Sequence, residues 1–213
     1  MLFVLPILIT LALFFSEDND TFSQIGNASY SNDKAQARCA AGTRPGESGA
    51  VNGESTGEGI KYNISMPLNY DPTIAHPLLM VYSPAKSNRA KTEKMTGLTL
   101  KATTAGFIVA YADHPELSPT STIELGTIPG LIAKKWCVDE QRIFLTGHSD
   151  GGTAAMALAF MAGTKHIPNA IAPSAAGIDY QDLRDRKCPK PIPTWLNKFC
   201  AYLIFIIKPS EYP

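Results

Sequence analysis

Apolar positions in the middle of the chain form runs that predict strands. Residues 60–66 alternate between apolar and polar side chains, which is the pattern of a half-buried strand. Residues 77–82 (P-L-L-M-V-Y) and 107–111 (F-I-V-A-Y) are continuous apolar runs bounded by turn-forming residues. Such runs are typical of strands covered on both faces. We therefore expect these two strands in the middle of a parallel sheet.

Helical periodicity separates the predicted strands. Residues 96–105 are expected to form a helix, with Gly106 just past its end as a C-cap. Apolar residues then recur at helical spacing over 128–136, with Thr127 as a candidate N-cap and Pro129 in the first turn. Strands that alternate with helices in this way predict an α/β protein with a doubly wound sheet.

A strand expected over residues 142–146 runs directly into the sequence G-H-S-D-G-G at 147–152. A serine between a strand and a helix, with glycine two positions before and two after, fits a nucleophile elbow, where bulk at either glycine would clash with neighbouring backbone. The apolar segment 153–161, ending near Gly163, is expected to be the buried helix that follows. An ordinary glycine-rich turn with a capping serine is the alternative. The strand before and the helix after favour the elbow, with Ser149 as nucleophile.

Histidine is the usual base for such a serine, and the chain has four histidines. His76 precedes a strand and is expected at the opposite edge of the sheet. His166 follows the elbow helix, which would carry it about 20 Å from the hydroxyl. His148 is expected to point away from Ser149 and to line a substrate pocket. His114 follows the strand at 107–111 on the active edge, as a candidate base or, more readily, a pocket-lining residue.

Composition narrows the class of partner. The 213 residues are 45% apolar, which is enough for one sizeable core. Nineteen basic residues balance nineteen acidic ones and no basic run occurs, so nucleic acid is not expected as a partner. The four cysteines are compatible with an oxidising compartment and allow three pairings; they are Cys39, Cys137, Cys188 and Cys200.

The first 58 residues differ from the rest. Residues 1–15 are an apolar run that is shorter than the roughly 20 residues of a membrane-spanning helix and suits a signal peptide. An uncleaved anchor or a mistaken gene start is the alternative, because no Lys or Arg precedes the run and no clear small-x-small cleavage site follows it. Residues 16–58 are rich in Gly, Ser, Asn and charged residues and are expected to be irregular. We therefore expect a secreted protein, periplasmic or extracellular, without a stable membrane span.

Several segments together resemble the polyhydroxybutyrate depolymerase and feruloyl esterase branch of the α/β hydrolases. The likeness covers about residues 59–193, and C-V-D-E-Q-R-I-F-L-T-G-H-S-D-G-G at 137–152 is its most specific part. The other segments that carry it are residues 59–67, 77–85, 106–113, 172–177 and 188–193. The resemblance implies an α/β-hydrolase-type, mostly parallel sheet flanked by helices.

The same resemblance implies a serine esterase acting on small or polymeric carboxylic esters, either polyesters or feruloyl and other aryl esters. It implies neither a metal nor an organic cofactor. The oxyanion hole would pair the backbone N–H of Asp150 with one from the loop after the strand at 77–82. Ala85 and Lys86 are the candidates for that second donor.

Residues 194–213 depart from the family's pattern. In α/β hydrolases an acid and then a histidine follow the serine on later strands, whereas residues 194–213 contain neither Asp nor His. We therefore expect residues 59–193 to be a partial hydrolase domain, truncated and missing its C-terminal strands, with an aberrant hydrophobic tail. Such a chain would be inactive or severely impaired. A non-catalytic binding module or a non-functional fragment of such an esterase is the alternative.

Overall fold

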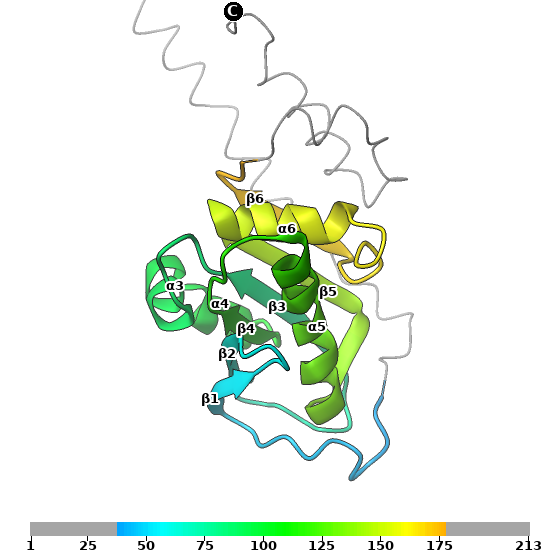
Figure 1. The fold of residues 1–213 in the computed structure, drawn as a ribbon. Coiled ribbons are helices and arrows are strands. Elements are labelled where there is room, and N and C mark those ends of the chain that lie inside the picture. The colour runs from blue at the N-terminus through cyan, green and yellow to red at the C-terminus, as the bar shows by residue number, and fades with distance from the viewer. Residues whose placement is uncertain (1–37, 178–213) are drawn as a thin grey trace, which may run out of the picture. The chain divides into compact units, whose positions relative to one another are not determined.

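The computed structural model describes residues 38–177, which are drawn in colour in Figure 1. The expected leader at 1–15, the tail at 194–213, and both Cys188 and Cys200 lie outside these residues.

A six-stranded mixed sheet forms the centre of the described residues, with the strand order β1-β2-β4-β3-β5-β6. The four strands from β4 to β6 pair in parallel, whereas β2 pairs antiparallel with both β1 and β4. The expected mostly parallel sheet flanked by helices is therefore confirmed. The strands are β1 (Ala50–Ser55), β2 (Lys61–Ser65), β3 (His76–Tyr82), β4 (Ile108–Ala112), β5 (Val138–His148) and β6 (Ala170–Ser174).

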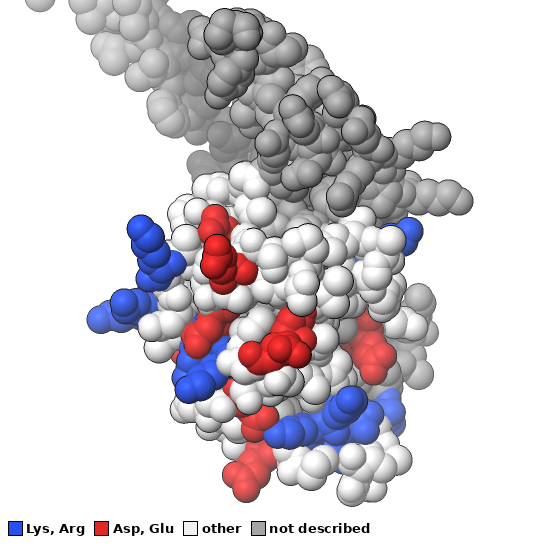
Figure 2. All heavy atoms as spheres, viewed as in Figure 1, with Lys and Arg blue, Asp and Glu red and all other residues white. Residues whose placement is uncertain are grey.

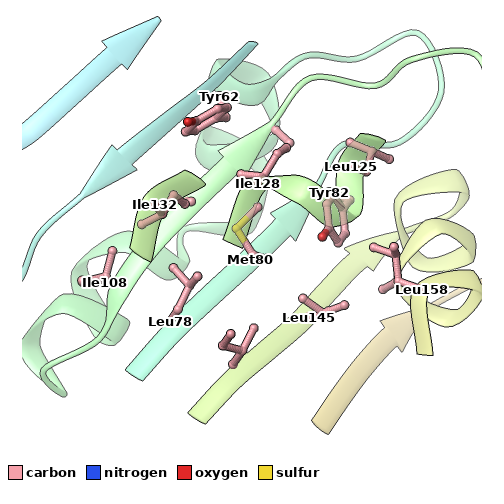
Figure 3. Close-up of a cluster of buried hydrophobic side chains, with 14 of the residues drawn as sticks. Tyr62, Leu78, Met80, Tyr82, Ile108, Leu125, Ile128, Ile132, Leu145 and Leu158 are labelled. Carbon is pink, nitrogen blue, oxygen red and sulfur yellow. The ribbon is translucent and has the colours of Figure 1, made fainter. Parts of the chain in front are cut away.

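The two continuous apolar runs form the central strands β3 and β4, as predicted. Every residue of β4 is buried, and so is every residue of β3 except Leu79. Helices α5 (Pro119–Lys135) and α6 (Asp150–Phe160) pack on one face, where Leu78, Met80 and Leu145 meet the helices (Figure 3). Helices α3 (Arg89–Thr96) and α4 (Leu98–Thr104) lie against the other face (Figure 1). Burial on both faces explains why these strands are apolar throughout.

The helix expected over residues 96–105 is present as α4, but it is shorter and follows a separate helix, α3. Its C-terminus has the predicted glycine: Gly106 has φ 83°. The N–H of Gly106 donates to the Thr103 carbonyl and that of Phe107 donates to the Ala102 carbonyl. This pair of bonds is a Schellman motif, which requires the left-handed conformation that glycine adopts readily.

Helix α5 begins much earlier than the sequence indicated, and the assignment of Thr127 as its N-cap was wrong. Ser118 is the N-cap, Pro119 follows at the start of the helix, and Ser121 completes a capping box. Pro129 lies inside the helix rather than in its first turn. The first two turns are largely polar, so helical periodicity in apolar residues becomes visible only in the second half of α5.

Three smaller differences concern the ends of elements. Part of the segment expected to be irregular forms β1, a mostly exposed edge strand held by pairing with β2. Strand β5 begins at Val138, four residues before the expected start, and α6 ends at Phe160 rather than near Gly163. None of the helices among residues 38–177 is long and apolar enough to span a membrane.

A disulfide joins Cys39 to Cys137, 98 residues apart in sequence. This bond is one of the three pairings that the sequence left open. It ties the segment before β1 to the residue that precedes β5. The N–H of Cys39 also donates to the carbonyl of Thr73, so the segment is held at more than one point.

Candidate active site

Ser149 lies at the bend between β5 and α6, at the carboxyl end of a strand that has parallel partners on both sides. Its backbone has φ 54° and ψ −124°, a conformation that residues with a Cβ adopt rarely. The side chain is half-buried. A strained backbone of this kind persists only where the surroundings enforce it, which makes the bend a candidate functional feature.

The glycines of the bend are required by space and not by backbone angle. A Cβ on Gly151 would lie 2.1 Å from the Tyr82 carbonyl oxygen, and one on Gly147 would lie 2.4 Å from the Gly151 carbonyl carbon. A Cβ on Gly152 would lie 2.8 Å from the carbonyl oxygen of Ser174. The elbow therefore lies directly against the ends of both β3 and β6. As predicted, any residue larger than glycine at these positions would clash with neighbouring backbone.

Strand β6 supports the bend from its other side. The N–H of Ser149 donates to the carbonyl of Ser174 over 2.9 Å. The first hydrogen bond of α6 runs from the N–H of Thr153 to the carbonyl of Ser149. The N–H of Asp150 lies at the start of the helix, where backbone donors have no partner within the helix and the helix dipole favours negative charge.

Unusual backbone conformations gather at this edge of the sheet. Within residues 38–177, the non-glycine residues with positive φ are Lys86, Ser149 and Ala175. They follow β3, β5 and β6, which are neighbours in the sheet. Because the carboxyl ends of parallel strands meet at one edge, all three lie on the side where α/β sheets bind ligands.

The loop after β3 begins with a β-turn. The N–H of Ser87 donates to the carbonyl of Pro84 over 3.1 Å, and Lys86, with φ 59°, occupies the third position of the turn. That position favours glycine in type II turns. Within the described range, neither Ala85 nor Lys86 uses its N–H in a hydrogen bond. Both residues are exposed, so their donors are available to a ligand.

The four histidines lie at different places in the structure relative to Ser149. The Nδ1 of His76 lies 3.0 Å from the Gly106 carbonyl, at the start of β3 and away from Ser149, and His166 is exposed beyond α6. His148 is exposed, with Nδ1 3.3 Å from Ser174 Oγ. Among residues 38–177, none of the histidines makes a hydrogen bond to Ser149.

His114 reaches the elbow through a contact that sequence reasoning missed. Its Nε2 lies 3.1 Å from Oδ2 of Asp150, the residue after the nucleophile. The sequence predicts a role for the N–H of Asp150 alone, whereas in the structure its carboxylate also has a partner. The two residues are 36 positions apart in sequence, and no local pattern could have found the pair.

Directly before the loop after β3, the buried side chain of Tyr82 has a hydroxyl group without a hydrogen-bond partner among the described residues. Burial raises the pKa of this phenol, so the group stays neutral. Its ring lies in the cluster that contains Leu125 (Figure 3). Tyr82 therefore contributes to the core beneath the site, with its carbonyl against Gly151.

On the face shown in Figure 2, acidic and basic side chains both occur, and neither covers the face continuously. Within residues 38–177 there is no group of three or more His, Cys, Asp or Glu side chains that could hold a metal ion.

The sheet order, the parallel central strands and the strained serine bend define an α/β-hydrolase fold. No protein-family model and no curated protein matches the sequence. Among solved structures, the chain is similar to the S-formylglutathione hydrolase FrmB from Staphylococcus aureus, with a TM-score of 0.51 and 16% identity over 66% of this chain and 61% of that one. It is also similar to an arylesterase, with a TM-score of 0.50 and 14% identity over 64% of this chain and 49% of that one.

The chain thus spans less than two thirds of the length of either protein. At these identities the likeness is one of fold. It agrees with the resemblance to α/β hydrolases in the sequence, and it does not distinguish the depolymerase and feruloyl esterase branch from other serine hydrolases.

Replacing Ser149 by glycine is expected to stabilise the protein. Glycine adopts φ 54° without the steric conflict of a Cβ, so the free energy of unfolding should rise by about 1 kcal/mol. Ser149→Ala keeps the Cβ and serves as the control, with stability close to that of the parent chain. Urea unfolding followed by circular dichroism measures both. A Ser149→Gly chain that is less stable than Ser149→Ala would show that the bend is not strained.

Proposed function

We propose that residues 38–177 are the nucleophile-bearing part of a carboxylic-ester hydrolase in which Ser149 attacks the ester. The observation that carries the proposal is the positive φ of Ser149, a strained backbone conformation, at the carboxyl end of a central parallel strand. A nucleophile elbow requires a serine with a strained backbone and, two positions before and after it, residues no larger than glycine. The names of the two similar structures, an S-formylglutathione hydrolase and an arylesterase, agree with acyl transfer from a thioester or an ester.

The proposed reaction is acyl transfer through Ser149. The serine Oγ bonds to the ester carbonyl carbon, its proton passes to water, and the carbonyl oxygen becomes an oxyanion. The N–H of Asp150 and an N–H from Ala85 or Lys86 stabilise that oxyanion. Within residues 38–177 these N–H groups make no hydrogen bond outside the helix, and they follow neighbouring parallel strands at one edge of the sheet. The carbon–oxygen bond to the alcohol then breaks, and the leaving oxygen takes a proton from water. A water molecule then attacks the acyl-enzyme, which releases the acid and returns a proton to Ser149.

The rate of this chain is proposed to be low. Serine is a weak nucleophile without a base, and loss of the triad histidine costs about six orders of magnitude in a well-studied protease. The chain has four histidines, all within the described range, and none of them bonds to Ser149 there. The same observation favours a second candidate function: an ester-binding module that holds its ligand against the elbow without turnover.

For the substrate we propose a polyester, feruloyl or other aryl ester, as in the depolymerase and feruloyl esterase branch. The segments that resemble this branch, above all residues 137–152, support the choice. Secretion, to the periplasm or the extracellular space, is part of the proposal. The bond between Cys39 and Cys137 supports it, since disulfides persist in oxidising compartments.

Covalent labelling tests the nucleophile directly. We expect a fluorophosphonate probe to add one mass increment to the parent chain, slowly, and none to Ser149→Ala. Ser55→Ala is the matched control, because Ser55 is an exposed serine at the end of β1 and should leave labelling unchanged. Intact-mass spectrometry gives the rates, and hydrolysis of p-nitrophenyl acetate by the same three chains gives turnover.

The outcomes separate the candidates. Labelling that persists in Ser149→Ala, or that is missing from the parent chain, ends the proposal that Ser149 is the nucleophile. Retention of an aryl ester in equilibrium binding, with no Ser149-dependent labelling, favours the binding module instead.

A further inference from the structure

The end of β4 is bonded to both ends of the loop that follows β3. The hydroxyl of Ser83, a buried residue, donates to the carbonyl of Ala112 over 2.6 Å. Thr92 in α3 donates to that same hydroxyl over 2.7 Å. At the other end of the loop, the carboxylate of Asp113 accepts from the N–H of Arg89 over 2.8 Å and from its Nη1 over 2.7 Å. The loop proposed to carry the second oxyanion donor is therefore anchored to Ala112, the last residue of β4, and to Asp113, which follows it.

His114, the residue after Asp113, is bonded to the elbow. His114 Nε2 lies 3.1 Å from Oδ2 of Asp150, whose N–H is the first oxyanion donor. The imidazole is largely buried, with 12% of its side chain exposed, whereas the carboxylate of Asp150 is 42% exposed. The segment 112–114 thus contacts the two separate pieces of chain that would form the oxyanion hole.

An oxyanion hole works only when its two donors are held in register. Each N–H must lie about 2.7–3.1 Å from one oxygen position, and sites that are loose by about 1 Å lose most of their effect. Here one donor belongs to the loop after β3 and the other to the first residue of α6. The start of the loop lies directly against the elbow, because a Cβ on Gly151 would meet the carbonyl oxygens of both Tyr82 and Ser83. The end of the loop and the carboxylate of Asp150 have the further contacts described above.

We infer that the segment 112–114 aligns the two halves of the oxyanion hole, with His114 as the positioning residue that fixes Asp150. The inference rests on the proposed function and deepens it. His114 acts through Asp150 and does not take the proton of Ser149, to which it makes no hydrogen bond within residues 38–177. Asp113 is held in turn by its N–H, which donates to the carbonyl of Lys61 in β2.

Three variants test the role of His114. His114→Ala removes the contact, His114→Gln keeps a side-chain N–H donor, and His166→Ala is the matched control at an exposed histidine beyond α6. For each full chain, the fluorophosphonate reaction at Ser149 is measured over a range of probe concentrations. This separates probe binding from the maximal rate of bond formation at the serine.

We expect His114→Ala to lower the maximal labelling rate by about 10- to 100-fold, because a donor moves while the nucleophile stays. Probe binding should change little. His114→Gln should restore most of the rate, and His166→Ala should match the parent chain. A single side-chain hydrogen bond contributes about 1 kcal/mol to stability, so the melting temperature of His114→Ala should fall by less than about 4 °C. A purely structural role predicts the reverse, namely a large change in melting temperature and no selective change in the labelling rate, and would overturn the inference.

Amide hydrogen exchange tests the alignment independently of any reaction. In His114→Ala, peptides covering residues 83–89 and 147–153 should exchange faster than in the parent chain and in His166→Ala. Unchanged exchange in both peptides overturns the inference, whatever the labelling shows. If Ser149→Ala is labelled as fast as the parent chain, the proposed nucleophile fails, and the exchange result alone decides whether His114 positions Asp150.

Discussion

Gly151→Ala is expected to disrupt the fold of the elbow and to destabilise the whole sheet. The added Cβ would lie 2.1 Å from the carbonyl oxygen of Tyr82 and 2.7 Å from its carbonyl carbon. Both are backbone atoms of β3, which is bonded to β4 on one side and β5 on the other and cannot move aside. We expect the free energy of unfolding to fall by more than about 3 kcal/mol, the upper range for overpacking.

A matched substitution controls for the change from glycine to alanine itself. Gly130 lies on the exposed side of α5, and a Cβ there would meet no atom within 4 Å. Gly130→Ala should therefore stabilise the protein by about 0.5–1 kcal/mol, through helix propensity alone. Urea unfolding followed by circular dichroism compares the two variants. A Gly151→Ala chain as stable as Gly130→Ala would mean that the elbow is not packed against β3 as described.

Removal of the Cys39–Cys137 disulfide is the second large effect that we expect. The bond joins residues 98 apart, and in the chain-entropy model a loop of about 100 residues corresponds to about 4.7 kcal/mol. Both cysteines should be replaced by alanine, because a serine at the fully buried position 137 would add an unpaired hydroxyl to the core. We expect this double variant to lose about 2–5 kcal/mol of unfolding free energy.

Reductant supplies an internal control for that measurement. Reduction should lower the free energy of unfolding of the parent chain to nearly that of the double variant. The double variant has no Cys39–Cys137 bond to reduce, so loss of this bond cannot change its own free energy of unfolding. A second double variant, with Cys188 and Cys200 replaced by alanine, keeps the bond and reports any contribution from the other two cysteines. Equal stability of the parent chain and the Cys39→Ala/Cys137→Ala variant would contradict the prediction.

Much of the fold could be predicted because burial determines which positions of a strand or helix must be apolar, and that pattern is visible in the local sequence. Strands β3 and β4 are covered on both faces and must be apolar at every position, so their runs were visible without any structure. Strand β2 is covered differently on its two faces, and its alternation was equally visible. The start of α5 was missed for the same physical reason. Its first turns are largely polar, and its capping signal, Ser118 followed by Pro119, carries no periodicity.

The candidate site also has one part that could be predicted from the sequence and one part that could not. The bend at Ser149 could be predicted because it is built within six consecutive residues, and the close approach of backbone at Gly147 and Gly151 permits no larger side chain. The second half of the site could be placed only by analogy. Lys86 has a conformation that glycine adopts more readily, so its sequence contains no sign of the turn that it forms.

By itself, then, the sequence determined the class of fold, the central strands and the elbow with its serine, because each depends on neighbours in the chain. Only the tertiary structure decided which cysteine pairs with Cys39, how the loop after β3 is anchored, and that His114 meets Asp150. Those contacts join residues far apart in sequence, and they exist because strand order brings the ends of β3, β4 and β5 to one edge of the sheet. No local sequence pattern predicts that proximity, because it depends on the order of the strands in the folded sheet.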